Sequence, residues 1–138
     1  MRKEVQVYIN INPKGYVRMT KRSRFTDAAK RYHAYMSALK VLYRASLTAQ
    51  GLSPKLLPKG ELGDIEFGIE VPSKNKKYDK RVGEYHTMKP DWDNLCKALQ
   101  DSIFYGEERD DSHVYKVGSV QKKWVAVGDG YIKFSFFI

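Results

Sequence analysis

The chain has 138 residues, of which 42% are hydrophobic and 13% aromatic, and its formal net charge at pH 7 is +9. This length and composition predict one globular domain over residues 1–138. The positive charge favours a nucleic-acid partner, while a membrane partner is excluded because no segment reaches transmembrane length or combines a basic face with a lipid-seeking one. The single cysteine excludes an intrachain disulfide and favours a reducing compartment, so we expect a cytoplasmic protein.

The N-terminal half is predicted to form a strand and a long helix. Apolar and polar residues alternate over residues 5–11, which is typical of a half-buried strand, and the turn residues 12–15 end it. After a basic loop, Thr26 is expected to cap a helix that runs to about Ala49. One face of that helix should be buried, through Ala28, Tyr32, Met36, Leu39, Tyr43 and Ser46. The opposite face should carry Lys30, Lys40 and Arg44.

The C-terminal half is predicted to be richer in strands. Alternation over residues 65–71 indicates a second strand, and residues 72–88 are interpreted as a mobile basic loop. A short helix is expected from Asp93, then strands over 114–127 and 131–138 joined by a hairpin. The order β–α–β–α–β–β predicts an α/β (α+β) domain with a mixed sheet.

Acidic residues are concentrated in one part of this basic chain. Residues 1–60 have a balance of +11, whereas residues 91–111 have a balance of −5. A surface that attracts polyanions while gathering acid at one place is explained most simply by a bound divalent cation. Carboxylates prefer hard cations such as Mg²⁺ or Mn²⁺, and such a metal lets a nuclease approach a phosphodiester.

The spacing of the acidic residues is consistent with a shared ion. Asp91 and Asp93 are two residues apart before a helix, so in an extended segment both carboxylates would point the same way. Lys97 follows Asp93 by four residues and would lie on the same side of the helix. Asp110 and Asp111 come after the helix, immediately before the next strand.

Simpler interpretations of these residues stay open. Either Asp91 or Asp93 could be only a helix N-cap, and Asp110-Asp111 could be a solvated turn. A calcium-binding EF-hand loop does not fit the pattern, and one cysteine with three scattered histidines does not suit zinc. His113 is either a support for Asp111 or a plain surface histidine. Cys96 is expected to be a buried thiol.

Taken together, the motifs resemble a known family. The block Lys89-Pro90-Asp91-x-Asp93-Asn94-Leu95-x-Lys97-Ala98, followed by Asp101 and by Asp110-Asp111-Ser112, resembles the RusA-type Holliday-junction resolvases, small endonucleases common in phages. The resemblance covers residues 89–124 well and residues 5–25 weakly. His113 stands where the family commonly has glutamine, and Tyr16-Val17 interrupts the usual basic loop.

The resemblance implies a mixed α/β homodimer that cuts four-way DNA junctions with Mg²⁺ or Mn²⁺. Its catalytic carboxylates match Asp91, Asp93 and Asp111, its catalytic lysine matches Lys97, and Asp110 occupies the adjoining position as a further candidate ligand. The basic loop is expected to bind backbone phosphates through Lys14, Arg18, Lys21, Arg22 and Arg24.

Two rival functions follow from the same residues. A non-catalytic nucleic-acid-binding accessory protein would keep the fold and lose the chemistry, although the intact Asp/Asp/Lys/Asp set argues against it. A different metal-dependent nuclease, such as one that cuts RNA, is excluded only by the resemblance.

Overall fold

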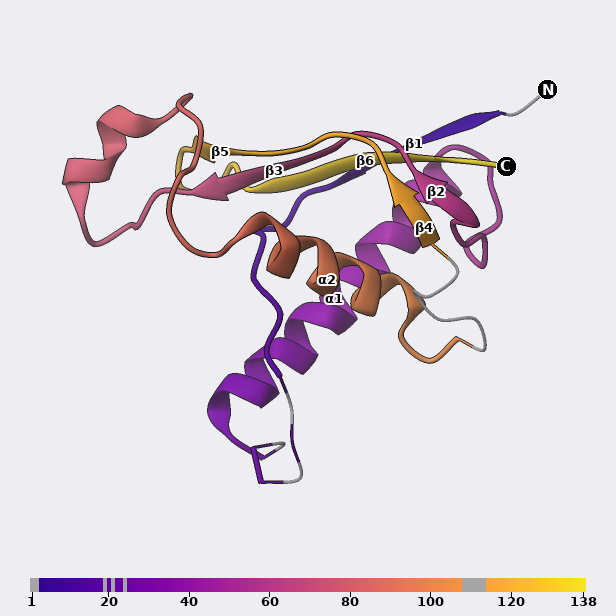
Figure 1. Cartoon of the computed structure of the whole chain (residues 1–138), viewed down its shortest axis with the longest axis horizontal. Coiled ribbons are helices and arrows are strands. Elements are labelled where there is room, and N and C mark those ends of the chain that lie inside the picture. The colour runs from indigo at the N-terminus through magenta and orange to yellow at the C-terminus, as the bar shows by residue number, and fades with distance from the viewer. Residues whose placement is uncertain (1–2, 19, 21, 24, 108–113) are drawn as a thin grey trace.

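A computed structural model of the chain describes residues 3–18, 20, 22–23, 25–107 and 114–138. The elements, in chain order, are β1 (Glu4–Ile9), α1 (Asp27–Ala49), β2 (Gly60–Leu62), β3 (Ile65–Glu70), the 3₁₀ helix η1 (Lys76–Arg81), α2 (Trp92–Phe104), β4 (Val114–Val117), β5 (Val120–Val125) and β6 (Tyr131–Phe137). The mixed sheet forms one layer, and both α-helices lie against the same face of it (Figure 1). The prediction of an α+β domain with a mixed sheet and two main helices is confirmed.

The C-terminal strand β6 is the centre of the sheet. It pairs antiparallel with β1 and also with β2 and β3, while β2 pairs in parallel with β4 and β3 in parallel with β5. Alternate residues of β1 face the core, and Val5, Val7 and Ile9 are each 1% exposed. The predicted strand at the N-terminus is therefore confirmed, and it ends at Ile9, two residues earlier than expected.

The strand predicted over residues 114–127 consists of two strands, β4 and β5, which are separated at Gly118. The Asp64 side chain lies at the interruption, where its Oδ1 accepts the Ser119 N–H at 2.9 Å. A Cβ on Gly118 would lie 2.6 Å from the same Asp64 Oδ1, so there is no room for a side chain at position 118. The neighbouring strand is interrupted at the same level, between β2 and β3. Strand β2 was not predicted from the sequence, because its three residues are too few to show an alternating pattern.

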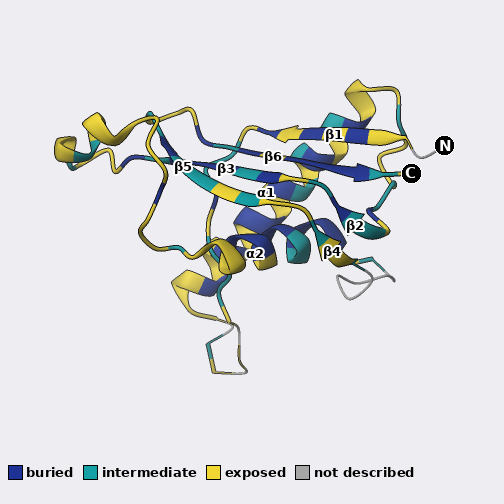
Figure 2. Ribbon diagram, turned by 45° about the horizontal axis from the view of Figure 1, so that its top comes forward, coloured by how far each residue is buried: buried dark blue, intermediate teal, exposed yellow. Residues whose placement is uncertain are grey.

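The long helix α1 has the predicted length and N-cap. The Thr26 side chain accepts the Ala29 N–H at 3.2 Å, as a capping threonine should. The buried stripe is displaced by one residue at each end from the prediction, since Ala29 and Leu47 are buried in place of Ala28 and Ser46. The seven buried residues are Ala29, Tyr32, Tyr35, Met36, Leu39, Tyr43 and Leu47. From Tyr32 onward these residues belong to one hydrophobic core with residues of α2 and the sheet, and Figure 2 shows α1 lying against the sheet with its buried residues in dark blue.

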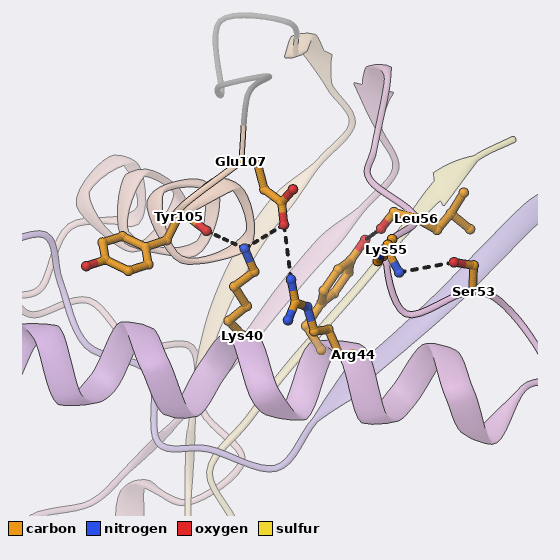
Figure 3. A network of polar contacts seen from close by, with 8 residues as sticks. Lys40, Arg44, Ser53, Lys55, Leu56, Tyr105 and Glu107 are labelled. Carbon is orange, nitrogen blue, oxygen red and sulfur yellow. Dashed lines mark hydrogen bonds and ion pairs between the residues drawn. The ribbon is translucent and has the colours of Figure 1, made fainter.

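The prediction that Lys40 projects away from the core is wrong. Its Nζ lies 2.7 Å from Glu107 Oε1 and also donates to the Tyr105 carbonyl, beside the end of α2 (Figure 3). Arg44 donates to the same Glu107 oxygen at 3.2 Å. The hydrogen bond from Lys40 is the largest cause that lowers the pKa of the Glu107 carboxyl, and the bond from Arg44 acts in the same direction. The chain is thus fixed to α1 just before the acidic segment that contains Asp110 and Asp111.

Residues 72–88, predicted as a mobile loop, include η1 and a stretch that pairs with β5. None of the helices in the described ranges is long and apolar enough to cross a membrane.

Candidate active site

The predicted carboxylates Asp91 and Asp93 lie at the start of α2. Asp91 is the N-cap residue, with φ −69° and ψ 152°, yet its side chain makes no capping hydrogen bond. Asp93 lies inside the first turn, and both residues are exposed. The N-cap interpretation therefore does not account for either carboxylate.

Both carboxylates are available to bind a ligand. Within the described part of the chain, neither makes a hydrogen bond or an ion pair. Two exposed carboxylates only two residues apart repel each other, and the partial positive charge of a helix N-terminus offsets only part of that repulsion. A hard divalent cation fits this oxygen donor set.

The predicted metal site also includes the second acidic pair, which follows α2 in the sequence. Asp110 and Asp111 lie outside the described residues, and so does His113. Among the residues that the structure describes, no group of three or more His, Cys, Asp or Glu side chains gathers in a metal-binding arrangement. The second acidic pair, as a ligand set, stays a prediction.

Lys97 lies one turn after Asp93 on the exposed side of α2, as predicted. Its Nζ is 4.2 Å from the centroid of the Tyr16 ring, a cation–π contact. The Tyr16 N–H donates to the Asn94 carbonyl at 3.1 Å, and a Cβ on Gly15 would lie 3.1 Å from the Pro90 Cβ. The loop after β1 therefore packs directly on the first turns of α2, beside the two carboxylates.

A second tyrosine extends this contact along α2. The Tyr32 ring meets the Tyr16 ring edge to face, with centroids 5.9 Å apart. The Tyr32 hydroxyl donates to Asp101 Oδ2 at 3.2 Å. Burial raises the pKa of Tyr32, and the charge of Asp101 adds to the shift. Asp101, which belongs to the motif, thus accepts a hydrogen bond that joins α2 to α1.

Lys122 of β5, which the sequence pattern did not identify, holds the segment before Asp91. Its Nζ donates to the Met88 carbonyl at 2.8 Å and to the Pro90 carbonyl at 2.9 Å. Burial lowers the pKa of Lys122, and the charge of Asp91 opposes this shift. Lys122 pairs in register with Phe67, so it faces the core side of the sheet. A lysine at an inward position of a strand is the sequence signal that could have identified it.

Cys96 is buried, as predicted. Burial raises the pKa of its thiol to about 12, and the charge of Asp93 acts in the same direction. A thiol of this kind is not a nucleophile at neutral pH. Cys96 therefore packs in the core behind the site.

The predicted DNA-binding residues lie in the loop between β1 and α1, which projects beyond α2 (Figure 1). Lys14, Arg18 and Arg22 are exposed. Lys21 and Arg24 lie outside the described residues. Tyr16, which contacts Lys97, lies two residues from Lys14 and two from Arg18 in the sequence of this loop. The exposed cations therefore lie close in the chain to the residue that packs on α2.

Comparison with known proteins gives a family. The family model described as endodeoxyribonuclease RusA matches residues 10–130, which includes the basic loop, α2 and the acidic segment after it. No curated protein matches the chain. The match extends over most of the chain and contains the motif block at the start of α2. The chain therefore belongs to the RusA family of Holliday-junction endodeoxyribonucleases.

Proposed function

We propose that this nuclease resolves four-way DNA junctions in recombination and repair by paired phosphodiester cuts that depend on Mg²⁺ or Mn²⁺. The observation that carries the proposal is the pair of uncommitted carboxylates, Asp91 and Asp93, beside Lys97 at the start of α2. Family membership supplies the nuclease chemistry, and these side chains are free to perform it.

The metal would be held by Asp91, Asp93 and Asp111, with Asp110 as a further ligand. When bound, the metal supplies a coordinated water of lowered pKa and neutralises charge on the phosphate and on the leaving 3′ oxygen. Asp91 and Asp93 would hold that metal at the start of α2. Lys122 holds the carbonyls of Met88 and Pro90 and so restrains the backbone that leads to Asp91.

Lys97 would stabilise the negative charge that develops on the phosphate in the transition state. Its Nζ is restrained by the Tyr16 ring and lies on the same side of α2 as Asp93. The basic loop would bind backbone phosphates through Lys14, Arg18, Lys21, Arg22 and Arg24. Such contacts position the DNA without reading its sequence.

A four-way junction has near two-fold symmetry, and its resolution requires two symmetric cuts. One active site per chain makes a C2 homodimer the matching assembly. We place the enzyme in the cytoplasm of a phage-infected or prophage-carrying cell, where the DNA is accessible.

Cleavage of a synthetic four-way junction, measured beside a linear duplex of equal length, tests the proposal. The expected result is paired nicks in the junction with Mg²⁺ or Mn²⁺ and no cleavage in EDTA. Tight junction binding without cleavage under every metal condition would favour the non-catalytic accessory protein. Preferential cleavage of a structured RNA would favour an RNA nuclease.

A further inference from the structure

Residues 72–88, here called the basic arm, form a second concentration of positive charge. The arm contains five basic and two acidic residues. All five cations are exposed, and Figure 2 shows the arm as a projecting, largely exposed segment. The basic residues are Lys74, Lys76, Lys77, Lys80 and Arg81.

The arm is fixed to the sheet by an aromatic contact. The Tyr78 ring packs against the Trp124 ring of β5, with centroids 5.7 Å apart. Lys77 Nζ and Arg81 Cζ each lie 5.6 Å from the centroid of Tyr78. Two of the five cations therefore contribute to the attachment of η1 to β5.

Backbone hydrogen bonds fix the segment of the arm that returns toward α2. The Gly83 N–H donates to the Trp124 carbonyl, and the Trp124 N–H donates to the Glu84 carbonyl, both at 2.9 Å. The His86 N–H donates to the Lys122 carbonyl at 2.9 Å. The arm thus extends the sheet beyond β5 and then continues directly to Asp91.

The other three cations have no comparable role in the fold. Lys74, Lys76 and Lys80 make no hydrogen bond, ion pair or ring contact within the residues that the structure describes. Several exposed like charges within one short segment repel each other. A bound polyanion would offset that repulsion, and none of the ion pairs among the described residues involves these three lysines.

We propose that the basic arm is a second phosphate-binding surface for the backbone of duplex DNA, separate from the loop between β1 and α1. This inference rests on the proposed DNA substrate. The two basic segments extend from different sides of the start of α2, the arm beside β5 and the loop beyond α2 (Figures 1 and 2). The arm therefore binds DNA that continues past the carboxylates on the side away from the loop.

The test compares two double variants that remove equal charge. Lys76→Ala/Lys80→Ala changes the arm, while Lys55→Ala/Lys59→Ala changes exposed lysines between α1 and β2, at the far end of the molecule (Figure 1). The affinity for a labelled four-way junction is measured in EDTA by fluorescence anisotropy at several salt concentrations. Each phosphate contact adds about 0.9 to the slope of log K against log salt, so the arm variant should lose about 2 units of slope.

The control variant should keep the wild-type slope, and Lys76→Arg/Lys80→Arg should restore it in the arm. Thermal denaturation of each variant checks that the fold is retained. If wild type binds the junction and both Ala variants keep its affinity and slope, the arm is not a DNA contact. If wild type itself shows no binding to the junction, the proposed function fails instead. A loss of equal size in both Ala variants would show that only net charge matters, and it would overturn the assignment to the arm.

Discussion

The ammonium of Lys97 lies over the face of the Tyr16 ring, with Nζ 4.2 Å from the ring centroid. Lys97 belongs to α2, whereas Tyr16 belongs to the loop after β1, so the contact joins the candidate catalytic helix to the basic loop. The Tyr16 N–H bond to the Asn94 carbonyl fixes the backbone at the same point. The position of the lysine thus depends on a residue far from it in the sequence.

Loss of the Tyr16 ring should slow DNA cleavage, because the ring restrains the Lys97 ammonium. A cation–π contact contributes about 0.5–2 kcal/mol, so Tyr16→Leu should lower the single-turnover rate by about 2- to 30-fold. Tyr16→Phe keeps the ring face and should retain most of the rate. In a Lys97→Ala background, which should itself be slow while still binding metal, Tyr16→Leu should have little further effect. Equal rates for the Leu and Phe variants would contradict this role for the ring.

Replacement of Asp93 by Asn should remove most cleavage while leaving the fold and junction binding intact. The substitution keeps size and hydrogen-bonding capacity but deletes the charge of a metal ligand, and less negative charge then faces the phosphate. Nicking assays and junction affinity, measured together, check this. The matched control is Asp129→Asn, in the exposed turn between β5 and β6, which should cut at the wild-type rate. Wild-type cleavage by Asp93→Asn would refute the assignment, and failure to fold would indicate a structural role.

Lys122→Met should destabilise the fold and slow cleavage, because the ammonium that holds the carbonyls of Met88 and Pro90 is removed. Hydrogen bonds to charged groups contribute about 1.5–3 kcal/mol, and the partial exposure of this lysine places the expected loss at the low end. Urea denaturation measures it. Lys123→Met is the control on the same strand.

Lys123 faces the open side of the sheet, where its Nζ lies 3.5 Å from Glu66 Oε1. A partly exposed ion pair at the surface of the sheet contributes about 0–1 kcal/mol. Lys123→Met should therefore change the free energy of unfolding less than Lys122→Met and leave cleavage unchanged. The reverse order would contradict the assigned role of Lys122.

Folding stability should fall as the pH drops through about 6.5, the usual pKa of an unperturbed histidine. His86 is 4% exposed, and burial, followed by the charge of Lys122, lowers its pKa. Between its folded and unfolded pKa values the unfolded chain binds a proton that the folded chain does not, so acid favours unfolding. Urea denaturation at pH 7 and pH 5.5 measures the difference.

His86→Phe should reduce this pH dependence, since the variant has no imidazole to protonate. His33→Gln should keep it, because His33 is exposed. An unchanged pH dependence in His86→Phe would show that other groups are responsible.

The sequence by itself determined the features that depend on local spacing. Alternation marked the strand that became β1, and Thr26 marked the start of α1, because capping and amphipathic periodicity involve residues within a few positions of each other. The motif around Asp91 and Lys97 was identified in the same way. Lys97 follows Asp93 by four residues, so helical geometry alone places these two side chains on the same side of α2.

Only the tertiary structure decided which distant residues support that motif. Lys122 reaches the backbone before Asp91 because β5 lies beside that segment, and Tyr16 covers Lys97 because its loop packs on α2. The backbone next to Gly118 likewise contacts Asp64, which lies between β2 and β3. Local patterns carry no information on these pairs, because strand pairing and helix packing join segments that are far apart in the sequence. No fixed spacing between two residues predicts such a contact.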